Sequence, residues 1–158
     1  MKEATIRDFL LGLAPTSRLE AEAREAVEPV GRGSRRVHIE DLPPGEEVAV
    51  TADMLVQLCD AVLAGSLSSS ALETVAFAIV ASDHFRWEDD EALVGRVLYD
   101  WASPEINFQL TPDNLRMFRE WLTGKVRPPS EPDVTPDTLS ELGFPRRTSK
   151  VRVIPGTS

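Results

Sequence analysis

The sequence predicts a mainly α-helical fold: an antiparallel bundle of four to five helices with a small β-hairpin near the N-terminal third of the chain. Between residues 51 and 124, apolar side chains recur at the three- and four-residue spacing of a helix face. Helix-start signals precede these segments, and the loops between them are short, which suits antiparallel neighbours. Before residue 51, a stretch of alternating polar and apolar side chains around prolines and a glycine supplies the hairpin.

The first thirty residues are expected to contain two short helices. Thr5 is a suitable N-cap for a helix over residues 5–13. Ser17 and Glu20 have the spacing of a capping box, in which each side chain bonds a backbone N–H near the other residue. This spacing predicts a second helix, which Pro29 ends.

The expected hairpin follows these two helices. Residues 37–42 alternate like a strand, residues 43–45 (Pro-Pro-Gly) favour a turn, and residues 46–50 supply the return strand. Two strands alone are marginal in water, so we expect them to pack against the helices. The basic segment Gly31–Arg36 before them is interpreted as a solvated linker, and a phosphate or RNA contact is the alternative.

Two helices are expected between residues 51 and 81. Thr51 caps the first, and Gly65 is suited to end it. A second capping box, Ser70–Glu73, begins the next helix. Its apolar stripe over Leu72–Val80 is nearly continuous, which places this helix at the centre of the core.

Two more helices complete the bundle. The apolar residues within Leu93–Trp101 share one helix face, and Pro104 closes that helix. The pair Thr111-Pro112 combines an N-cap with a proline at the first helical position, and Gly124 ends the helix that follows. We therefore divide the chain into an N-terminal helical segment with the hairpin (1–50), an acidic helical core (51–125) and a proline-rich linker and tail (126–158).

Charge is the most informative property of the composition. The 158 residues carry a net charge of −9. Twelve acidic and four basic residues between 51 and 124 give that segment −8 of it. An acidic surface repels nucleic acid and anionic membranes and attracts basic proteins. The sequence therefore predicts a basic protein partner, no nucleic acid and no membrane, although acidity that serves only solubility remains the alternative.

Several functional classes lack support in the sequence. No run of apolar residues is long enough for a membrane span, and the first residues lack the layout of a signal peptide, so a cytoplasmic protein is expected. The single cysteine, Cys59, lies on an apolar helix face and is interpreted as a buried side chain rather than a nucleophile. No nucleotide-binding, zinc-protease or hydrolase motif is present, so we expect neither an enzyme nor a cofactor.

The stretch from Ser82 to Trp101 is the strongest candidate for a functional surface. It contains four consecutive carboxylates directly after a tryptophan. An exposed aromatic residue beside acids is typical of a hot spot that binds a basic protein surface, and core packing of Trp87 is the alternative. The predicted partner-binding residues are Asp83, Phe85, Trp87, Glu88, Asp89, Asp90, Glu91, Asp100 and Glu105.

The acidic run Glu88–Glu91 has three interpretations. Consecutive residues on a helix point about 100° apart, so four in a row do not converge on one metal ion, and we expect no metal site. Acids in a first helical turn are favoured by the helix dipole. Helix capping and a protein-binding surface therefore remain the two explanations for this run.

Part of the chain resembles a known family. The central half is similar to the small acidic helical immunity proteins that neutralise bacterial nuclease toxins of the colicin kind. The similar segments are Leu55–Leu63, Leu72–Val80, Glu88–Glu91, Trp101–Phe108 and Arg119–Gly124. The paired tyrosines of that family are missing, since Tyr99 is the only tyrosine, and residues 1–50 and the tail have no counterpart.

The resemblance implies inhibition by binding, in which acids and an aromatic anchor cover a cationic toxin surface. The expected function is therefore that of a non-catalytic, acidic protein-binding domain, with toxin neutralisation as its specific form. The alternative is a structural or adaptor subunit of a larger bacterial assembly. In that case the hairpin, the linker and the tail would make the contacts.

Overall fold

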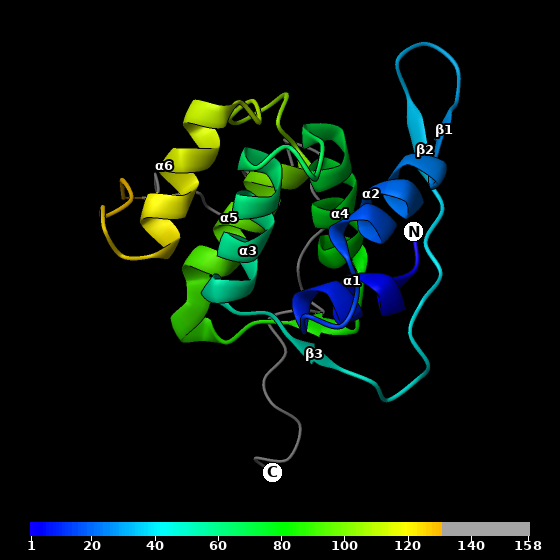
Figure 1. Ribbon diagram of the computed structural model, residues 1–158, viewed down its shortest axis with the longest axis horizontal. Helices are drawn as coiled ribbons and strands as arrows, with labels where there is room; N and C mark the ends of the chain where they lie inside the picture. The colour runs from blue at the N-terminus through cyan, green and yellow to red at the C-terminus, as the bar shows by residue number, and fades with distance from the viewer. Residues whose placement is uncertain (131–158) are drawn as a thin grey trace, which may run out of the picture. The chain divides into compact units, whose positions relative to one another are not determined.

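The computed structural model describes residues 1–130, which contain six α-helices and two small two-stranded sheets (Figure 1). The helices are α1 (Glu3–Leu10), α2 (Thr16–Glu25), α3 (Ala52–Leu63), α4 (Ser69–Ala81), α5 (Ala92–Ala102) and α6 (Pro112–Leu122). The strands are β1 (Val27–Pro29), β2 (Arg35–Val37), β3 (Val48–Ala49) and β4 (Phe85–Arg86), and a 3-10 turn, η1 (Asp89–Glu91), precedes α5. The prediction of a mainly helical fold with a small antiparallel hairpin is confirmed. Most of the predicted linker and tail, beyond residue 130, lies outside the described residues.

Residues Met1–Val126 share one hydrophobic core, centred on α4. This helix packs against α1, α2, α3 and α5, and its buried residues fall on several faces, as the continuous apolar stripe predicts. The predicted bundle of four to five helices is not confirmed. Instead, α1 and α2 belong to the same core as the four helices that follow.

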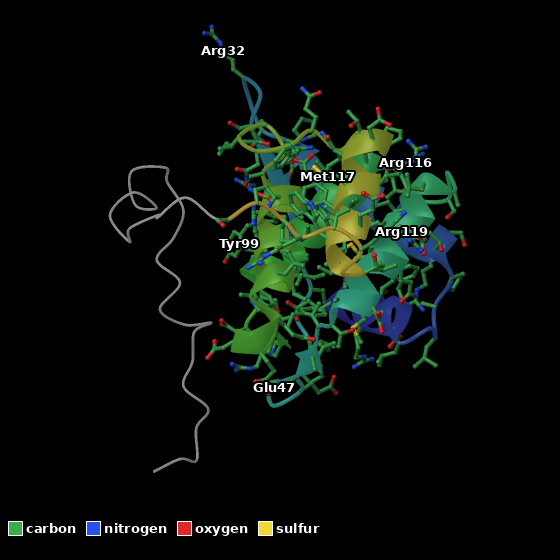
Figure 2. All side chains as sticks on the ribbon, turned by 90° about the vertical axis from the view of Figure 1, so that its left-hand side faces the viewer. Arg32, Glu47, Tyr99, Arg116, Met117 and Arg119 are labelled. Atoms are coloured by element: carbon green, nitrogen blue, oxygen red, sulfur yellow. The ribbon has the colours of Figure 1, made fainter. Side chains whose placement is uncertain are left out.

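A cluster of aromatic rings joins α5 to α6. Phe118 contacts Trp101, Phe108 and Trp121 edge-on, with ring centroids 5.3–6.0 Å apart. Edge-to-face pairs of this kind add to the free energy of burying the rings. Trp101 and Trp121 are therefore core residues. On the outer side of α6, Arg119 Nε lies 2.6 Å from Asp60 Oδ1 and links this helix to α3 (Figure 2).

The predicted helix starts are correct for α3 and α6. Thr51 Oγ1 accepts a hydrogen bond from Met54 N at 3.4 Å, and Thr111 Oγ1 accepts one from Asn114 N at 3.2 Å. Both predicted capping boxes are wrong. Ser17 lies inside α2, and the N-cap of α4 is Ser68 rather than Ser70, with Ser68 Oγ accepting from Ala71 N at 3.1 Å.

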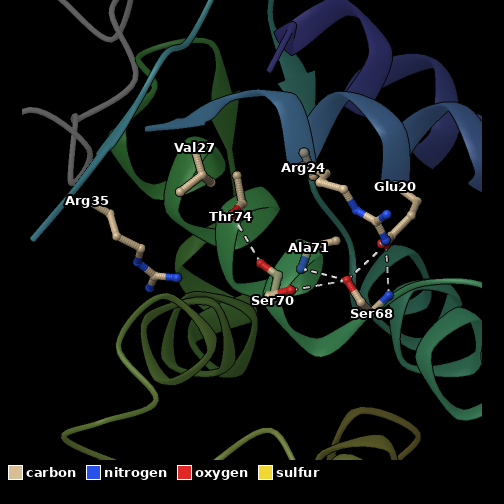
Figure 3. Close-up of a pocket in the computed structure, with 9 residues that line it drawn as sticks. Glu20, Arg24, Val27, Arg35, Ser68, Ser70, Ala71 and Thr74 are labelled. Atoms are coloured by element: carbon tan, nitrogen blue, oxygen red, sulfur yellow. Dashed lines mark hydrogen bonds and ion pairs between the residues drawn. The ribbon is translucent and has the colours of Figure 1, made fainter. Parts of the chain in front are cut away.

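Glu20 explains the failure of the first capping box. Its carboxylate does not bond its own helix backbone near Ser17. It instead accepts hydrogen bonds from Ser68 N and Ser68 Oγ, at 2.8 and 3.0 Å, and so ties α2 to the start of α4 (Figure 3). The predicted cap Thr5 is likewise inside α1, where its hydroxyl donates to Glu22 at 2.9 Å.

The hairpin lies earlier in the chain than predicted. Strands β1 and β2 pair antiparallel, with Val27 opposite Val37, so the segment Gly31–Arg36 provides the turn and part of a strand rather than a linker. Gly31 and Gly33 have φ of +70° and +74°, a conformation that glycine adopts without strain and that lets the chain reverse here.

The predicted strands 37–42 and 46–50 do not pair with each other. Val37 is the partner of Val27 in the β1–β2 hairpin, so the start of the first predicted strand is already paired elsewhere. Instead, β3 pairs in parallel with β4, which places Val48 opposite Phe85. This parallel pair joins the N-terminal third of the chain to the stretch that carries the predicted functional residues.

Candidate protein-binding surface

The segment between α4 and η1 forms a fixed corner. Ser82 Oγ accepts a hydrogen bond from His84 N at 2.9 Å and so orders the end of α4. The carbonyls of His84 and Arg86 then accept from Val48 N and Val50 N, at 2.8 and 2.7 Å. Because these two hydrogen bonds tie the backbone of residues 84–86 to the β3 segment, the side chains of the corner have a defined position.

Trp87 lies against α5 at a position where that helix has no side chain. A Cβ atom placed on Gly95 would lie 2.6 Å from Trp87 Nε1 and 3.2 Å from Cε2, far inside normal contact distance. The tryptophan ring therefore fits only because residue 95 is glycine. Trp87 is half-buried and packs on the core with part of its surface open to solvent, which combines the two interpretations from the sequence.

Carboxylates flank this tryptophan in the sequence. Asp83, Glu88 and Asp89 are exposed, Glu91 is half-buried, and none of the four has an ion-pair partner within residues 1–130. Asp90 lies in η1, and its side chain falls outside the described part of the structure. We name Asp83, Trp87, Glu88, Asp89 and Glu91 the acidic corner.

The remaining predicted partner-binding residues do not join this surface. Phe85 is fully buried, because the alternation along β4 turns it into the core, and its predicted place at the surface is wrong. Asp100 is half-buried and Glu105 is exposed, but both lie at the opposite end of α5. Asp100 lies nine positions after Glu91, a rise of about 14 Å along a helix. One continuous acidic surface is therefore not formed.

The single arginine of the Ser82–Glu91 segment is paired with a carboxylate from another part of the chain. Arg86 Nε lies 2.9 Å from Glu47 Oε1, which comes from the loop before β3. The positive charge is thus held beside β3 and does not compensate the four carboxylates. The corner remains acidic at its exposed side.

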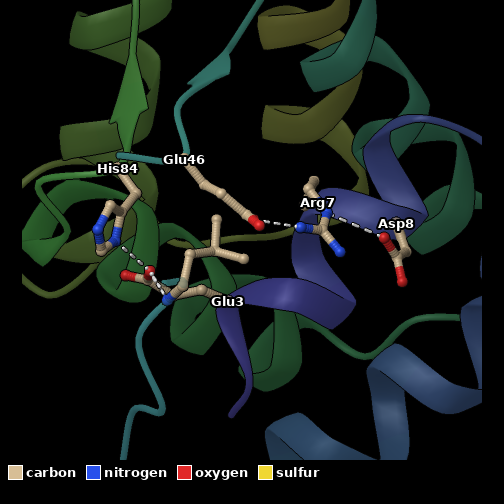
Figure 4. Close-up of polar contacts among 6 residues, drawn as sticks. Glu3, Arg7, Asp8, Glu46 and His84 are labelled. Carbon is tan, nitrogen blue, oxygen red and sulfur yellow. Dashed lines mark hydrogen bonds and ion pairs between the residues drawn. The ribbon is translucent and has the colours of Figure 1, made fainter. Parts of the chain in front are cut away.

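A buried carboxylate, that of Glu3, binds the loop that leads into the corner (Figure 4). Glu3 Oε2 accepts from Leu42 N at 2.8 Å and lies 2.8 Å from His84 Nδ1. The Glu3 side chain is 1% exposed, and its Oε1 has no hydrogen-bond partner among residues 1–130. This carboxylate fixes α1 to the loop that leads into β4, and so holds His84 and the residues after it.

Two pockets are described for residues 1–130. One, of about 370 Å³, is a wide, open hollow beside Met1, Glu22 and His38. The other is small, is lined by polar and apolar residues, and lies at the start of α4 (Figure 3). Its volume of about 160 Å³ is below the range of roughly 300 to 1,000 Å³ typical of ligand sites. Burial acts to raise the pKa of Glu20 there, but the hydrogen bonds from Ser68 and the nearby Arg24 outweigh it and lower this pKa below its ordinary value. The protein's own carboxylate thus occupies the position at which a helix N-terminus attracts an anion.

Nucleophilic and metal chemistry have little structural basis in the described residues. Cys59 is fully buried, and burial, followed by the charge of Asp60, raises the pKa of its thiol to about 12. A thiol in this state is not a nucleophile at neutral pH. Within residues 1–130, no three His, Cys, Asp or Glu side chains are arranged to hold a metal ion.

No protein-family model, curated protein or solved structure matches this chain. Among the described helices, none has both the length and the apolar surface needed to span a bilayer. The function is therefore argued from the geometry of the acidic corner.

Two residues of this site were missed in the sequence. Glu3 reads as an ordinary acid in the first turn of a helix, and its contact with His84 spans 81 positions, so no local pattern indicates it. Gly95 offered a weak signal, since a glycine in the middle of an apolar helix costs stability and usually has a packing reason. That reason is the ring of Trp87.

Proposed function

We propose that this chain is a non-catalytic domain that binds a basic protein through its acidic corner. The observation that supports it most is that four carboxylates close in sequence to the half-buried Trp87 have no ion-pair partner within residues 1–130. In the rest of the structure many exposed acids are paired, as in Arg7–Glu46, Arg119–Asp60 and Arg116–Asp113. A cluster of unpaired carboxylates costs free energy through mutual repulsion, and a basic partner would remove that cost.

Trp87 gives this surface an anchor as well as charge. Aromatic residues dominate binding hot spots because they bury a large area with little loss of side-chain freedom. The ring is held by Gly95, and the corner by β3 and Glu3, so little ordering would be required on binding.

Toxin neutralisation in the cytoplasm is the specific form of this proposal. A toxin that acts on nucleic acid carries a cationic surface, and an acidic corner with an aromatic anchor would cover it. The resemblance of the central helices to colicin-type immunity proteins supports this form, and the corner's chemistry is compatible with it.

The proposal is tested by capture of proteins from the host lysate in about 0.1 M and about 1 M salt, where the screening length falls from about 10 Å to about 3 Å. The corner variant carries Glu88→Lys, Asp89→Lys and Glu91→Lys. We expect one basic protein to be retained at low salt by the native chain and lost by the variant and at high salt. Binding is then confirmed with the purified partner.

A matched control separates the corner from net charge. The variant Glu25→Lys, Asp41→Lys and Asp53→Lys makes the same change in charge at exposed acids without ion-pair partners elsewhere in residues 1–130. It should retain the partner nearly as well as the native chain. Equal loss in both variants, or no loss in the corner variant, would exclude the corner as the binding surface.

A structural or adaptor role in a larger bacterial assembly is the second candidate. The observation that favours it is the β1–β2 hairpin, whose outer residues are all exposed. An adaptor would bind through this hairpin or through the chain beyond residue 126. Its binding would then survive the corner variant.

A further inference from the structure

The β1–β2 hairpin projects from the body of the protein. Every residue from Glu28 to Arg36 is exposed, and the loop is closed by a hydrogen bond of 2.8 Å from Val30 N to Ser34 O. Arg32 stands at the tip, away from the other labelled residues (Figure 2). The outer half of the hairpin is therefore not buried against the hydrophobic core.

Contacts at its base hold the hairpin in position. His38 N donates to Ala26 O at 2.9 Å, and Arg35 on β2 forms an ion pair with Glu73 on α4. An isolated two-stranded hairpin is marginal in water, so these anchors fix where it points. An exposed element that is held in place in this way is suited to contact another molecule.

The charge on the hairpin is opposite to that of the protein as a whole. Arg32 and Arg36 are exposed and have no ion-pair partner within residues 1–130. The acid on this hairpin, Glu28, lies 2.8 Å from His38 Nε2. Val30, which is 40% exposed, adds an apolar side chain beside the arginines. We name Val30, Arg32 and Arg36 the basic arm.

The basic arm and the acidic corner lie at opposite ends of the Met1–Val126 unit. In Figure 2, Arg32 is at the top and Glu47, the ion-pair partner of Arg86 in the corner, is at the bottom. The two surfaces therefore cannot meet within one chain. They can meet between two chains.

We propose that the basic arm of one copy binds the acidic corner of a second copy. The unpaired arginines would neutralise Glu88 and Asp89, and Val30 would contact the open side of Trp87. This inference rests on the proposed function, because it takes the corner as a binding surface. It adds that the arm of a second copy competes with the basic partner for the corner. A basic partner would have to displace the arm of the second copy, so self-association would regulate access to the corner.

A second copy fits the arm better than a nucleic acid does. The net charge of −9 repels a polyanion and a second copy alike at long range, so the choice rests on the contacts. A second copy presents Glu88 and Asp89 next to Trp87, which match the arginines and Val30 of the arm. Glu28 and Glu73 lie next to Arg36 and Arg35 and would repel a phosphate backbone there. Attraction between the arm and the corner is strongest at contact, so part of it survives screening in about 0.1 M salt and much less in about 1 M salt. Two different ends that bind each other form a heterologous contact.

Sedimentation velocity over a range of protein concentrations tests this inference. The native chain is expected to self-associate in about 0.1 M salt and to dissociate in about 1 M salt. The arm variant Arg32→Glu, Arg36→Gln should reduce the association constant about tenfold or more, because it replaces attraction by repulsion. Glutamine at 36 avoids placing a second acid opposite Glu28 on β1.

Two further proteins make the result specific. The control Arg116→Glu, Lys125→Gln changes the net charge equally at exposed residues of α6 and the segment after it, and should associate like the native chain. A protein that combines the arm variant with Glu88→Lys and Asp89→Lys has the charges exchanged, and self-association should return. A native chain that stays monomeric, an arm variant that associates normally, or an arm that binds a single-stranded oligonucleotide instead would each overturn the inference.

The two proposals fail in different ways. The arm variant leaves the corner intact, so it should still capture the basic partner, and should capture more of it if the arm competes. If self-association is absent but the corner variant loses the partner, only the inference about the arm is wrong. If neither the partner nor a second copy depends on the corner, the proposed function is wrong as well.

Discussion

At the scale of single residues, Gly95 determines where Trp87 can lie. An alanine at this position gains about 1 kcal/mol of helix propensity over glycine. Its methyl group would also lie 2.6 Å from Trp87 Nε1, inside normal contact distance. Overpacking of this kind costs roughly 1 to 3 kcal/mol. The sign of the net effect therefore depends on whether the ring is present.

We expect Gly95→Ala to leave the native chain no more stable, or to destabilise it by up to about 2 kcal/mol, and to stabilise the Trp87→Ala chain by about 1 kcal/mol. Urea unfolding of the native chain, the two single variants and the double variant measures both effects. The same gain in both backgrounds would mean that the ring does not lie on Gly95.

Glu3 is the second residue whose role is decided by burial. Glu3→Ala leaves Leu42 N without its acceptor and His84 without its partner, both away from most of the solvent. The expected loss in the free energy of unfolding is about 1 to 3 kcal/mol. Urea unfolding of this variant is compared with Glu25→Ala, an exposed acid, which should change stability by less than about 0.5 kcal/mol. Equal effects would contradict a supporting role for Glu3.

At the scale of elements, the start of α4 is held by two different side chains. Ser68 caps the helix, and Glu20 bonds the backbone and the hydroxyl of Ser68. We expect Ser68→Ala to cost about 1 kcal/mol in unfolding free energy, as the loss of an N-cap usually does. Ser70→Ala, at the position that the sequence indicates as the cap, should be nearly neutral. Thermal unfolding compares the two, and the reverse order would contradict the observed cap.

The same contact makes a prediction about pH. The pKa of Glu20 is lowered in the folded protein by its hydrogen bonds to Ser68 and by Arg24. Its carboxylate therefore contributes stability above its unfolded pKa, the ordinary value of 4.5, and loses that contribution as the pH falls through the folded pKa. Glu20→Gln should therefore be less stable than the native chain at neutral pH, and the difference should shrink in acid. Urea midpoints at several pH values measure it. A difference that does not change with pH would show that the charge has no part.

These elements also show what the sequence can predict. Thr51 and Thr111 were found because an N-cap bonds the backbone three residues further on, within the reach of a local pattern. Glu20 matched a local capping pattern equally well, yet its partner is Ser68, 48 positions away. Local spacing indicates that a side chain can form a capping hydrogen bond. Tertiary packing decides which group becomes its hydrogen-bond partner.

At the scale of the whole molecule, charge is divided between two ends. The sequence indicates the excess of acid between residues 51 and 124, and it also shows the arginines of residues 32–36. It does not show that these groups lie at opposite ends, because the arginines lie in and after the turn of a hairpin that the sequence pattern placed later in the chain. For the same reason the acidic residues of the predicted site separate into the corner and the far end of α5.

The parallel pairing of β3 with β4 has a consequence for the order of folding. Val48 must find Phe85, and Glu3 must find His84 across 81 positions, before the corner is complete. Closing such long loops costs chain entropy that only later contacts compensate, whereas α3 and α4 require local contacts alone. The corner is therefore expected to form late in folding. Any change that loosens residues 1–50 would remove the corner while the helices behind it remain.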